Sequence, residues 1–392
     1  MSLFRILTAV ALCLVSVHAL SGYAAEHERS ENPLERFENH RERAAARGFE
    51  WEFVSTAEYL YNFDGGLDVG GDLRWDTSLF LQLDTEAAGW WRNGEIFAHL
   101  QAQGGNGITD DHVGDFQVLS NIDADDFEQV SEIWYRHRLA DGRVWVKFGK
   151  MEANEDFAFV EYGGEFLNSS PGFSPTVPLV TYPDQDWGIV LHTAFTEELH
   201  VNLGLFQGDN NGGRSVGNTA DALRGPKIFL EPSFNYELGD LPGTVRLGAW
   251  WNGQELESLN GLSQSDQTWG FYATWDQLLV ESDAGQAVGV FAQVGFSSED
   301  YYEAGQYYGA GVQVTAPLSR RQNDVAGIGV FHVQLSDEAG FETDSETTIE
   351  LYYKLQLSPR ISIKPDLQYI LNPGGTRNDN SIVAGVRTEL SF

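Results

Sequence analysis

Charged and aromatic side chains alternate with apolar ones along many segments of this 392-residue chain. Carboxylate, guanidinium and ammonium groups exchange hydrogen bonds with a polar solute, and aromatic rings offer it a flat apolar surface. This alternation therefore predicts a non-covalent binding surface along one side of several strands. The residues that we predict to line it are Arg74, Asp76, Glu132, Trp134, Arg136, Lys147, Glu350, Asp366 and Arg387, with Arg321 and Asp324 paired near a turn at its mouth.

The sequence carries no signature of catalysis. It lacks HExxH, GxSxG, P-loop and GxGxxG motifs, and its nine histidines are scattered without ligand spacing. Asp123, Asp125 and Asp126 resemble a calcium loop, but the glycine that such a loop requires is missing. We therefore predict no enzyme activity, no cofactor and no metal site, and interpret the three aspartates as an ordinary acidic loop.

The elements that position the polar face are strands. From about residue 49 onward the alternation has a period of two, and Gly, Asp and Asn turns separate the segments. In the last twelve residues, SIVAGVRTELSF, Ile382 and Val386 share one side, while Arg387 and Glu389 share the other. The same pattern fits a soluble β-sandwich, with its apolar side in a core, or a membrane barrel, with its apolar side toward lipid.

The N-terminus favours the membrane barrel. Arg5 precedes a mostly apolar run and Ala24-Ala25 forms a small-residue exit, so residues 1–25 are predicted to be a cleaved signal peptide. Cys13, the single cysteine, leaves with it. Residues 26–48 are predicted to be a charged periplasmic leader, either a short helix or a mobile segment, and residues 49–392 the barrel. Beyond residue 25 no stretch approaches the roughly 20 apolar residues of a spanning helix.

Composition and charge agree with a barrel. The chain has 42 glycines, 24 phenylalanines, 15 tyrosines and 11 tryptophans, a mix suited to turns and aromatic girdles. A formal net charge of −34 excludes nucleic acid as a partner. We predict that the acidic excess lies mainly in exposed loops, with residues 104–128 and 208–225 as long extracellular loops. Residues 161–186, rich in proline, are predicted to form a further loop that can fold inward.

Chain length sets the predicted size of the barrel. At about 20–24 residues per strand and connection, the chain forms about 16 antiparallel strands around an aqueous channel. Outer-membrane lipid would surround it, and the terminal strand ending at Phe392 resembles the signal read by the barrel-assembly machinery. Aromatic residues at strand ends are predicted to form interface belts: Trp90, Trp91, Tyr301, Tyr302, Tyr307 and Tyr308.

Several short segments occur in a fixed order: SEIWYRHRL at 131–139, VKFGK at 146–150, GGEFLNSSP at 163–171, SRRQNDVAGIG at 319–329, ETTIELYY at 346–353, KPDLQYILNPGG at 364–375 and GVRTELSF at 385–392. Over residues 49–392 this order resembles the carbohydrate-selective porin family, the OprB-type outer-membrane channels. The resemblance implies a 16-stranded barrel in the Gram-negative outer membrane, through which mono- and small oligosaccharides diffuse passively.

Sugar hydroxyls would then meet the charged residues and sugar rings the aromatic ones. Two alternatives stay open. The acidity favours a general or cation-preferring porin without sugar selectivity, and the period-two pattern alone allows an exported β-sandwich that binds polysaccharide.

Overall fold

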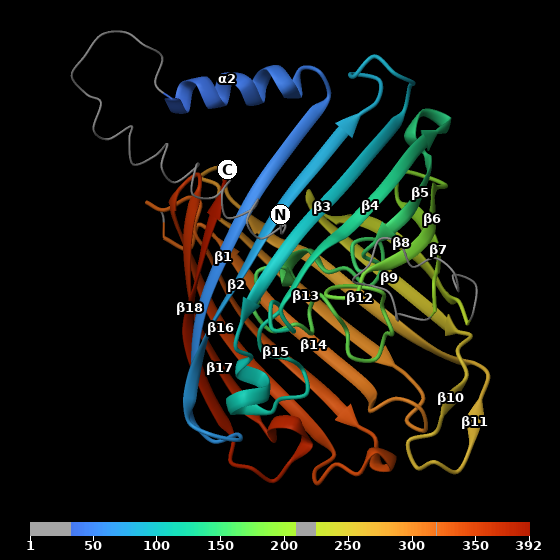
Figure 1. The fold of residues 1–392 in the computed structure, drawn as a ribbon, viewed down its shortest axis with the longest axis vertical. Coiled ribbons are helices and arrows are strands. Elements are labelled where there is room, and N and C mark those ends of the chain that lie inside the picture. Colours follow the sequence, from blue (N-terminus) through green and yellow to red (C-terminus); the bar gives the residue numbers. More distant parts are fainter. Residues whose placement is uncertain (1–32, 209–224, 319) are drawn as a thin grey trace.

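A closed barrel of sixteen antiparallel strands dominates the computed structural model, which describes residues 33–208, 225–318 and 320–392 (Figure 1). The predicted signal peptide lies outside these residues, as does most of the segment 208–225. The wall strands are β1 (Phe49–Asp64), β2 (Gly70–Asp84), β3 (Gly94–Gly105), β4 (Phe127–Leu139), β5 (Val144–Met151), β6 (Asp186–Ala194), β7 (Leu199–Phe206), β8 (Lys227–Leu238), β9 (Leu241–Asn252), β12 (Thr268–Glu281), β13 (Ala287–Phe296), β14 (Ala304–Thr315), β15 (Val325–Leu335), β16 (Ser345–Ser358), β17 (Ile361–Leu371) and β18 (Ser381–Ser391).

Each wall strand pairs with its neighbours in the sequence, and β18 pairs with β1 to close the barrel. A small two-stranded sheet, β10 (Leu256–Glu257) with β11 (Gln264–Ser265), projects from the connection between β9 and β12. The prediction of about sixteen strands in a barrel is confirmed. The β-sandwich alternative is wrong, because one closed sheet replaces two packed sheets.

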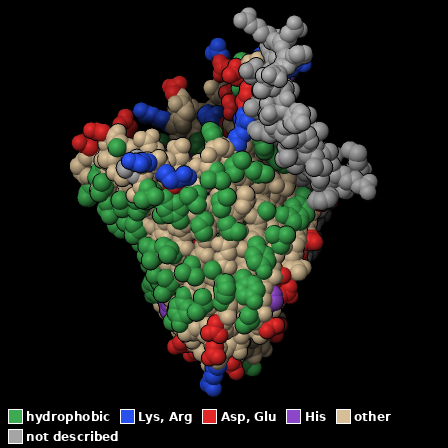
Figure 2. Space-filling view, turned by 90° about the vertical axis from the view of Figure 1, so that its left-hand side faces the viewer, with side chains coloured by type: hydrophobic (Ala, Val, Ile, Leu, Met, Phe, Trp, Pro, Cys, Tyr) green, Lys and Arg blue, Asp and Glu red, His purple; other side chains and the backbone are tan. Residues whose placement is uncertain are grey.

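The outer wall is apolar, as the alternation predicted. Leu73, Leu247 and Leu351 are all more than half exposed on the outer side of their strands. Figure 2 shows hydrophobic side chains covering a broad band of one outer face, with acidic and basic residues gathered toward its two ends. Exposing so large an apolar surface to water is unfavourable, whereas contact with the hydrocarbon of a lipid bilayer is favourable.

The two ends of the barrel differ. At the terminal end, where Phe49 and Phe392 lie, most connections are short turns. At the opposite end, the loop end, the long connections 106–126 and 152–185 leave the wall. Short turns on the periplasmic side and longer loops outside are the rule for outer-membrane barrels. The terminal end is therefore the periplasmic side.

Helix α2 (Pro33–Ala45) lies at the terminal end (Figure 1). The Phe37 ring packs edge-on against Trp51 at 5.1 Å, and the Arg41 guanidinium lies 5.4 Å from the same indole. Glu38 forms an ion pair with Arg360 in the turn between β16 and β17. The predicted leader thus contains a helix docked on the rim. Among the described residues, no helix has the length and apolar character needed to cross a membrane.

The loop 106–126 does not project outward, so the prediction that residues 104–128 form an extracellular loop is wrong. Its Ile108, Val113 and Leu119 pack inside the barrel against wall residues such as Ile370 and Val383. The prediction that residues 161–186 can fold inward is confirmed, since Phe166 lies among inward aromatic rings of β13 to β16. Much of the lumen is therefore filled by the chain itself.

The prediction that six aromatic residues form belts at the membrane interfaces is partly wrong, because some of them pack inside the barrel. Trp90, Trp91 and Tyr308 are exposed at the surface. Tyr307, however, is fully buried inside the barrel in the cluster that surrounds Phe166. Tyr302 packs edge-on against Trp250, a buried lumen residue, with ring centroids 5.4 Å apart.

Candidate functional site

Carboxylates on the inner wall hold the loop 106–126 in place. Glu346 of β16 accepts hydrogen bonds from the backbone N–H groups of Phe116 (2.7 Å) and Gln117 (2.9 Å). Glu58 of β1 accepts one from the Ser120 hydroxyl at 2.6 Å. Hydrogen bonds to a charged acceptor are stronger than neutral ones, so a wall carboxylate fixes a loop backbone effectively.

Wall carboxylates hold the loop 152–185 in the same way. Glu350 of β16, fully buried, accepts from the N–H groups of Leu167 (2.6 Å) and Asn168 (3.0 Å). Further wall carboxylates accept loop N–H groups around the barrel, namely Glu132 from Glu152 (3.1 Å), Glu231 from Ala158 (2.8 Å) and Asp276 from Glu161 (2.9 Å). The acidic excess therefore does not lie only in exposed loops, because part of it anchors loops inside the barrel.

Arg74 and Arg387 of the predicted lining belong to this scaffold. The Arg74 guanidinium donates to the carbonyl of Ile122 at 3.0 Å and pairs with Asp123 at 3.1 Å. Arg387 pairs with Glu58 at 2.6 Å and donates to the Ser120 hydroxyl at 3.3 Å. Both face the lumen, but loop 106–126 engages both guanidinium groups, and Glu58 of β1 also engages that of Arg387.

Two predicted aspartates are also engaged within the wall. Asp76 accepts from Ser78 (3.0 Å) and from the Gln101 amide (2.7 Å). Asp366 accepts from the Gln368 amide at 3.1 Å, and the same amide donates to the carbonyl of Leu119 at 2.8 Å. Asp366 thus supports a side chain that holds loop 106–126.

Toward the terminal end, a group of aromatic and charged side chains stays partly open to the lumen. Phe97 and Trp134 stack with ring centroids 4.8 Å apart. The Arg136 guanidinium lies between two indoles, 5.5 Å from Trp134 and 5.7 Å from Trp145. Its Nη2 donates to Glu95 at 2.6 Å, and about a quarter of its side chain (27%) remains exposed. We call Glu95, Trp134, Arg136 and Trp145 the arginine clamp.

Local backbone geometry sets the clamp. A bulge between His99 and Leu100 in the β3–β4 register turns both Ser131 and Glu132 toward the lumen, and Trp134 and Arg136 follow in phase. Opposite Trp134, Gly149 has φ +143°, and a Cβ atom there would lie 2.3 Å from the Ile133 carbonyl oxygen. The VKFGK segment thus needs its glycine so that β5 can approach β4 closely.

Lys147 connects the arginine clamp to loop 152–185 by contacting Trp134 and pairing with two loop carboxylates. Its ammonium group lies 2.5 Å from Asp156 and 3.6 Å from Glu155, and 5.2 Å from the centroid of the Trp134 ring. The lysine side chain is almost completely buried, whereas nearly half of Glu155 is exposed (48%). Of this pair, the solute-facing charge is therefore the carboxylate of Glu155.

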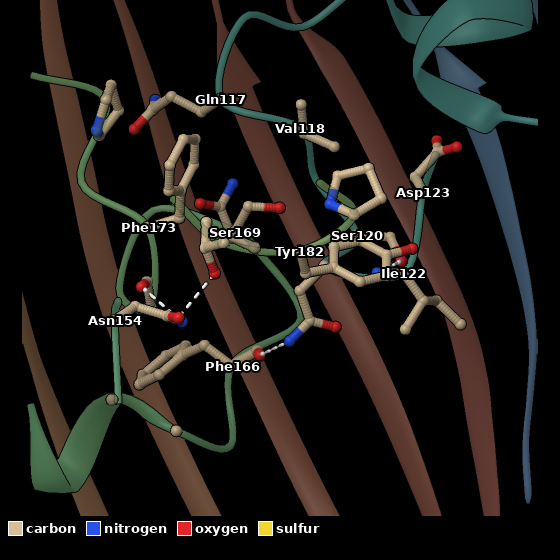
Figure 3. A pocket seen from close by; sticks show the side chains of 18 of the residues that line it. Gln117, Val118, Ser120, Ile122, Asp123, Asn154, Phe166, Ser169, Phe173 and Tyr182 are labelled. Carbon is tan, nitrogen blue, oxygen red and sulfur yellow. Dashed lines mark hydrogen bonds between the residues drawn. The ribbon is translucent and has the colours of Figure 1, made fainter. Parts of the chain in front are cut away.

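A cavity of about 510 Å³ lies between the two inward loops (Figure 3). Figure 3 shows amide, hydroxyl and aromatic side chains from both loops converging around it, including Gln117, Asn154, Ser169, Phe173 and Tyr182. A second cavity of about 830 Å³ lies at the terminal end, between helix α2 and the inner side of β1 to β3. Glu152 and Asn154 line the first cavity and Glu155 lines the second, so segment 152–155 lies between them.

We call the part of the lumen at segment 152–155, between the two cavities, the narrow region. Carboxylates of loop 152–185 set the charge there and nearby. Burial raises the pKa of Glu152 to about 7, although the Gln185 amide donates to it at 2.7 Å. Burial also raises the pKa of Glu155. Burial opposes the charge of Glu165 too, but Lys364 and Lys354, each 2.7 Å away, lower its pKa overall. The charge of Glu152 therefore changes near neutral pH.

Arg321 and Asp324 form an ion pair near a turn at the mouth of the barrel, as predicted. They lie in the turn between β14 and β15 at the terminal end, where Tyr353 also donates to Asp324 at 2.9 Å. The hydrogen bond from Arg321 lowers the pKa of Asp324. We expect Arg321→Ala to leave the uptake of uncharged solutes within error of the unmodified protein, because the pair lies away from both cavities. Liposome swelling checks this, and a severalfold loss of uptake would contradict it.

The sequence did not identify several residues of the site. Glu95 has the inward parity of β3, so the alternation alone could have included it. Gln117, Asn154, Ser169 and Tyr182 lie in loops without periodicity, so no local signal marks them. The predicted lining residues are thus divided between scaffold and lumen, with Trp134 and Arg136 in the clamp.

Comparisons with known proteins agree with the architecture. The model of the family "Carbohydrate-selective porin, OprB family" matches residues 76–392. Porin B of Pseudomonas aeruginosa is 22% identical over 401 residues, covering 88% of this chain and 88% of that protein. The high-pH structure of Pseudomonas putida OprB superimposes with a TM-score of 0.84 at 19% identity, covering 93% of this chain and 99% of that one. Its low-pH structure gives a TM-score of 0.61 at 17% identity, covering 94% and 100%.

Proposed function

Because this chain belongs to the OprB family of carbohydrate-selective porins, we propose that it conducts small carbohydrates by passive diffusion through the two cavities and past the arginine clamp. Family and fold imply a channel in the outer membrane of a Gram-negative bacterium rather than an enzyme. The observation that carries the proposal is the cavity of about 510 Å³ between two anchored loops, lined by amides, hydroxyls and aromatic rings.

Sugar chemistry matches this lining. Each sugar hydroxyl donates and accepts a hydrogen bond, and the ring presents C–H groups to an aromatic face. We propose that Arg136 and the exposed carboxylate of Glu155 bind sugar hydroxyls between the two cavities, while the rings of Trp134 and Trp145 restrict how closely the sugar ring can approach. Contacts of this kind are weak and serial, which suits transport because a tightly held solute would not leave.

A size series tests the function. Liposomes containing the purified protein should swell rapidly in isotonic monosaccharide and progressively more slowly with di- and trisaccharides, because inward loops narrow the lumen. Protein-free liposomes are the control. Equal swelling rates for sugars and for uncharged amides of the same size would remove the sugar preference and leave a general porin.

A cation preference is a second candidate function, favoured by the loop carboxylates at the narrow region. With the pKa of Glu152 raised to about 7 by burial, its carboxyl group is neutral below that pH and negative above it. We expect the cation-to-anion permeability ratio to rise between pH 6 and pH 8, and Glu152→Gln to flatten that rise. Reversal potentials in a salt gradient give the ratio.

Glu198→Gln provides the matched control for this pH dependence. Glu198 lies in the turn between β6 and β7, is fully exposed, and has a pKa lowered by a hydrogen bond from the Thr196 hydroxyl at 2.8 Å. It is ionised throughout the range and should leave the rise unchanged. The same pH dependence in the Glu152 variant would assign the titration to another group.

Chain organisation and assembly follow as part of the proposal. We propose export through residues 1–25, a leader at 26–48 and a barrel at 49–392, supported by helix α2 ending at Ala45 and β1 beginning at Phe49. Recognition of β18 and Phe392 by the barrel-assembly machinery is supported by the role of β18 as the closing strand. Outer-membrane lipid would contact the apolar outer band.

A further inference from the structure

Two histidines face each other on the inner wall near the terminal end. His192 of β6 and His200 of β7 are eight residues apart in the sequence, and the hairpin register pairs His192 with Asn202 and His200 with Ala194. The two side chains are therefore diagonal neighbours on the same side of the sheet. His192 Nε2 and His200 Nδ1 are 3.4 Å apart, and both residues are half-buried.

The hydrogen bonds of the other ring nitrogens fix both neutral tautomers. His192 Nδ1 lies 2.7 Å from Asn202 Oδ1, and the Asn202 amide nitrogen in turn donates to the carbonyl of Asp156 at 2.7 Å, which orients the amide. His200 Nε2 lies 3.0 Å from the carbonyl of Glu197. Each acceptor is an oxygen, so the nitrogen that faces it must carry the hydrogen.

The remaining nitrogens, His192 Nε2 and His200 Nδ1, then both present lone pairs to one another. Two lone pairs form no hydrogen bond, so a third group must lie between them for the contact to be favourable. Their separation suits a metal ion, because two nitrogens 2.0–2.1 Å from a tetrahedral Zn²⁺ ion lie about 3.4 Å apart. Imidazole is the ligand that Zn²⁺, Cu²⁺ and Ni²⁺ share, and a ligating histidine usually donates its other N–H to an oxygen.

We propose that His192 and His200 form a two-histidine site for a divalent transition-metal ion, with solvent completing the coordination. The described residues contain no group of three or more side chains gathered as metal ligands, so within this part of the chain the two histidines are the ligands. The site is rigid, since the Trp145 indole stacks on the His192 ring at 5.0 Å with an interplanar angle of 5°. A bound cation would thus lie next to the arginine clamp. This inference is independent of the sugar function.

Metal titration of the purified full-length protein, produced without a histidine tag and washed with EDTA, tests the site. Calorimetry with Zn²⁺ should give one ion per chain, and Cu²⁺ should give an electron paramagnetic resonance spectrum with two nitrogen ligands. His192→Gln and His200→Gln should each lower the affinity at least about tenfold, and Asn202→Leu, which removes the orienting acceptor, about tenfold. The heat-modified mobility of each variant on gels verifies that the barrel has formed.

His40→Gln is the matched control, because His40 is a single exposed histidine on helix α2. It should bind the ion as the unmodified protein does. Three results would overturn the site: no ion bound to the unmodified protein, an affinity in the His192 and His200 variants equal to that of the unmodified protein, or a Cu²⁺ spectrum with one nitrogen ligand. If the two rings merely share a proton, the first of these results follows.

Discussion

Glu350→Ala is expected to convert a narrow channel into a wide and noisy one. The Glu350 carboxylate is fully buried and accepts the N–H groups of Leu167 and Asn168 at 2.6 and 3.0 Å. Leaving a buried N–H group without its acceptor costs about 1–3 kcal/mol, so losing both hydrogen bonds weakens loop docking by about 3 kcal/mol. Since 1.4 kcal/mol is a factor of ten, the undocked population of loop 152–185 rises at least about a hundredfold.

Single-channel recording measures this release directly. The variant should show higher mean conductance with fluctuations between levels, and liposomes that contain it should swell in trisaccharide. Glu281→Ala is the control, since Glu281 is exposed at the terminal end of β12. Unchanged conductance and size limit in the Glu350 variant would show that the remaining anchors hold the loop without it.

Arg136→Ala should abolish most of the sugar selectivity while leaving the pore open. Glu95 and the two flanking indoles fix the guanidinium, and 27% of the side chain still faces the lumen. One charge-assisted hydrogen bond to a hydroxyl contributes about 1.5–3 kcal/mol, which corresponds to roughly ten- to a hundredfold in apparent affinity. The concentration of glucose that halves the ion current should rise by that factor.

Two further variants separate this role from a general charge effect. Arg136→Lys keeps the charge but not the planar fork, so it should recover little of the affinity. Arg138 also bonds to Glu95, at 2.5 Å, but its side chain is more exposed (40%) than that of Arg136, so Arg138→Ala is the matched control. An equal loss in both alanine variants would assign the effect to Glu95 or to overall charge.

The acidic residues of this protein have a structural role that composition alone does not indicate. Glu132, Glu231 and Asp276 accept backbone N–H groups of loop 152–185. A carboxylate suits this role because it accepts several hydrogen bonds at once and strengthens each one. Some of the acidic residues that contribute to the net charge of −34 therefore hold the two inward loops in place inside the barrel.

The sequence alone determined the wall of this protein. The period of two is a local property, since successive side chains of a strand point to opposite faces, and it identified the apolar outer side of Leu73 and Leu351 and the inward Arg136. Strand number followed from length, and the family from short segments in fixed order. None of these required knowledge of contacts between distant residues.

Only the tertiary structure decided what fills the barrel and which inward charges remain open to a solute. Glu350 meets Leu167 across 183 residues and Glu346 meets Phe116 across 230, and no periodicity encodes such contacts. Arg387 and Arg136 both lie on the inward face of their strands. A loop contacts the guanidinium of Arg387, whereas the side chain of Arg136 stays partly exposed. His192 and His200 likewise meet only through the hairpin register. Alternation fixes the face on which a side chain lies, whereas its partners depend on how the loops pack.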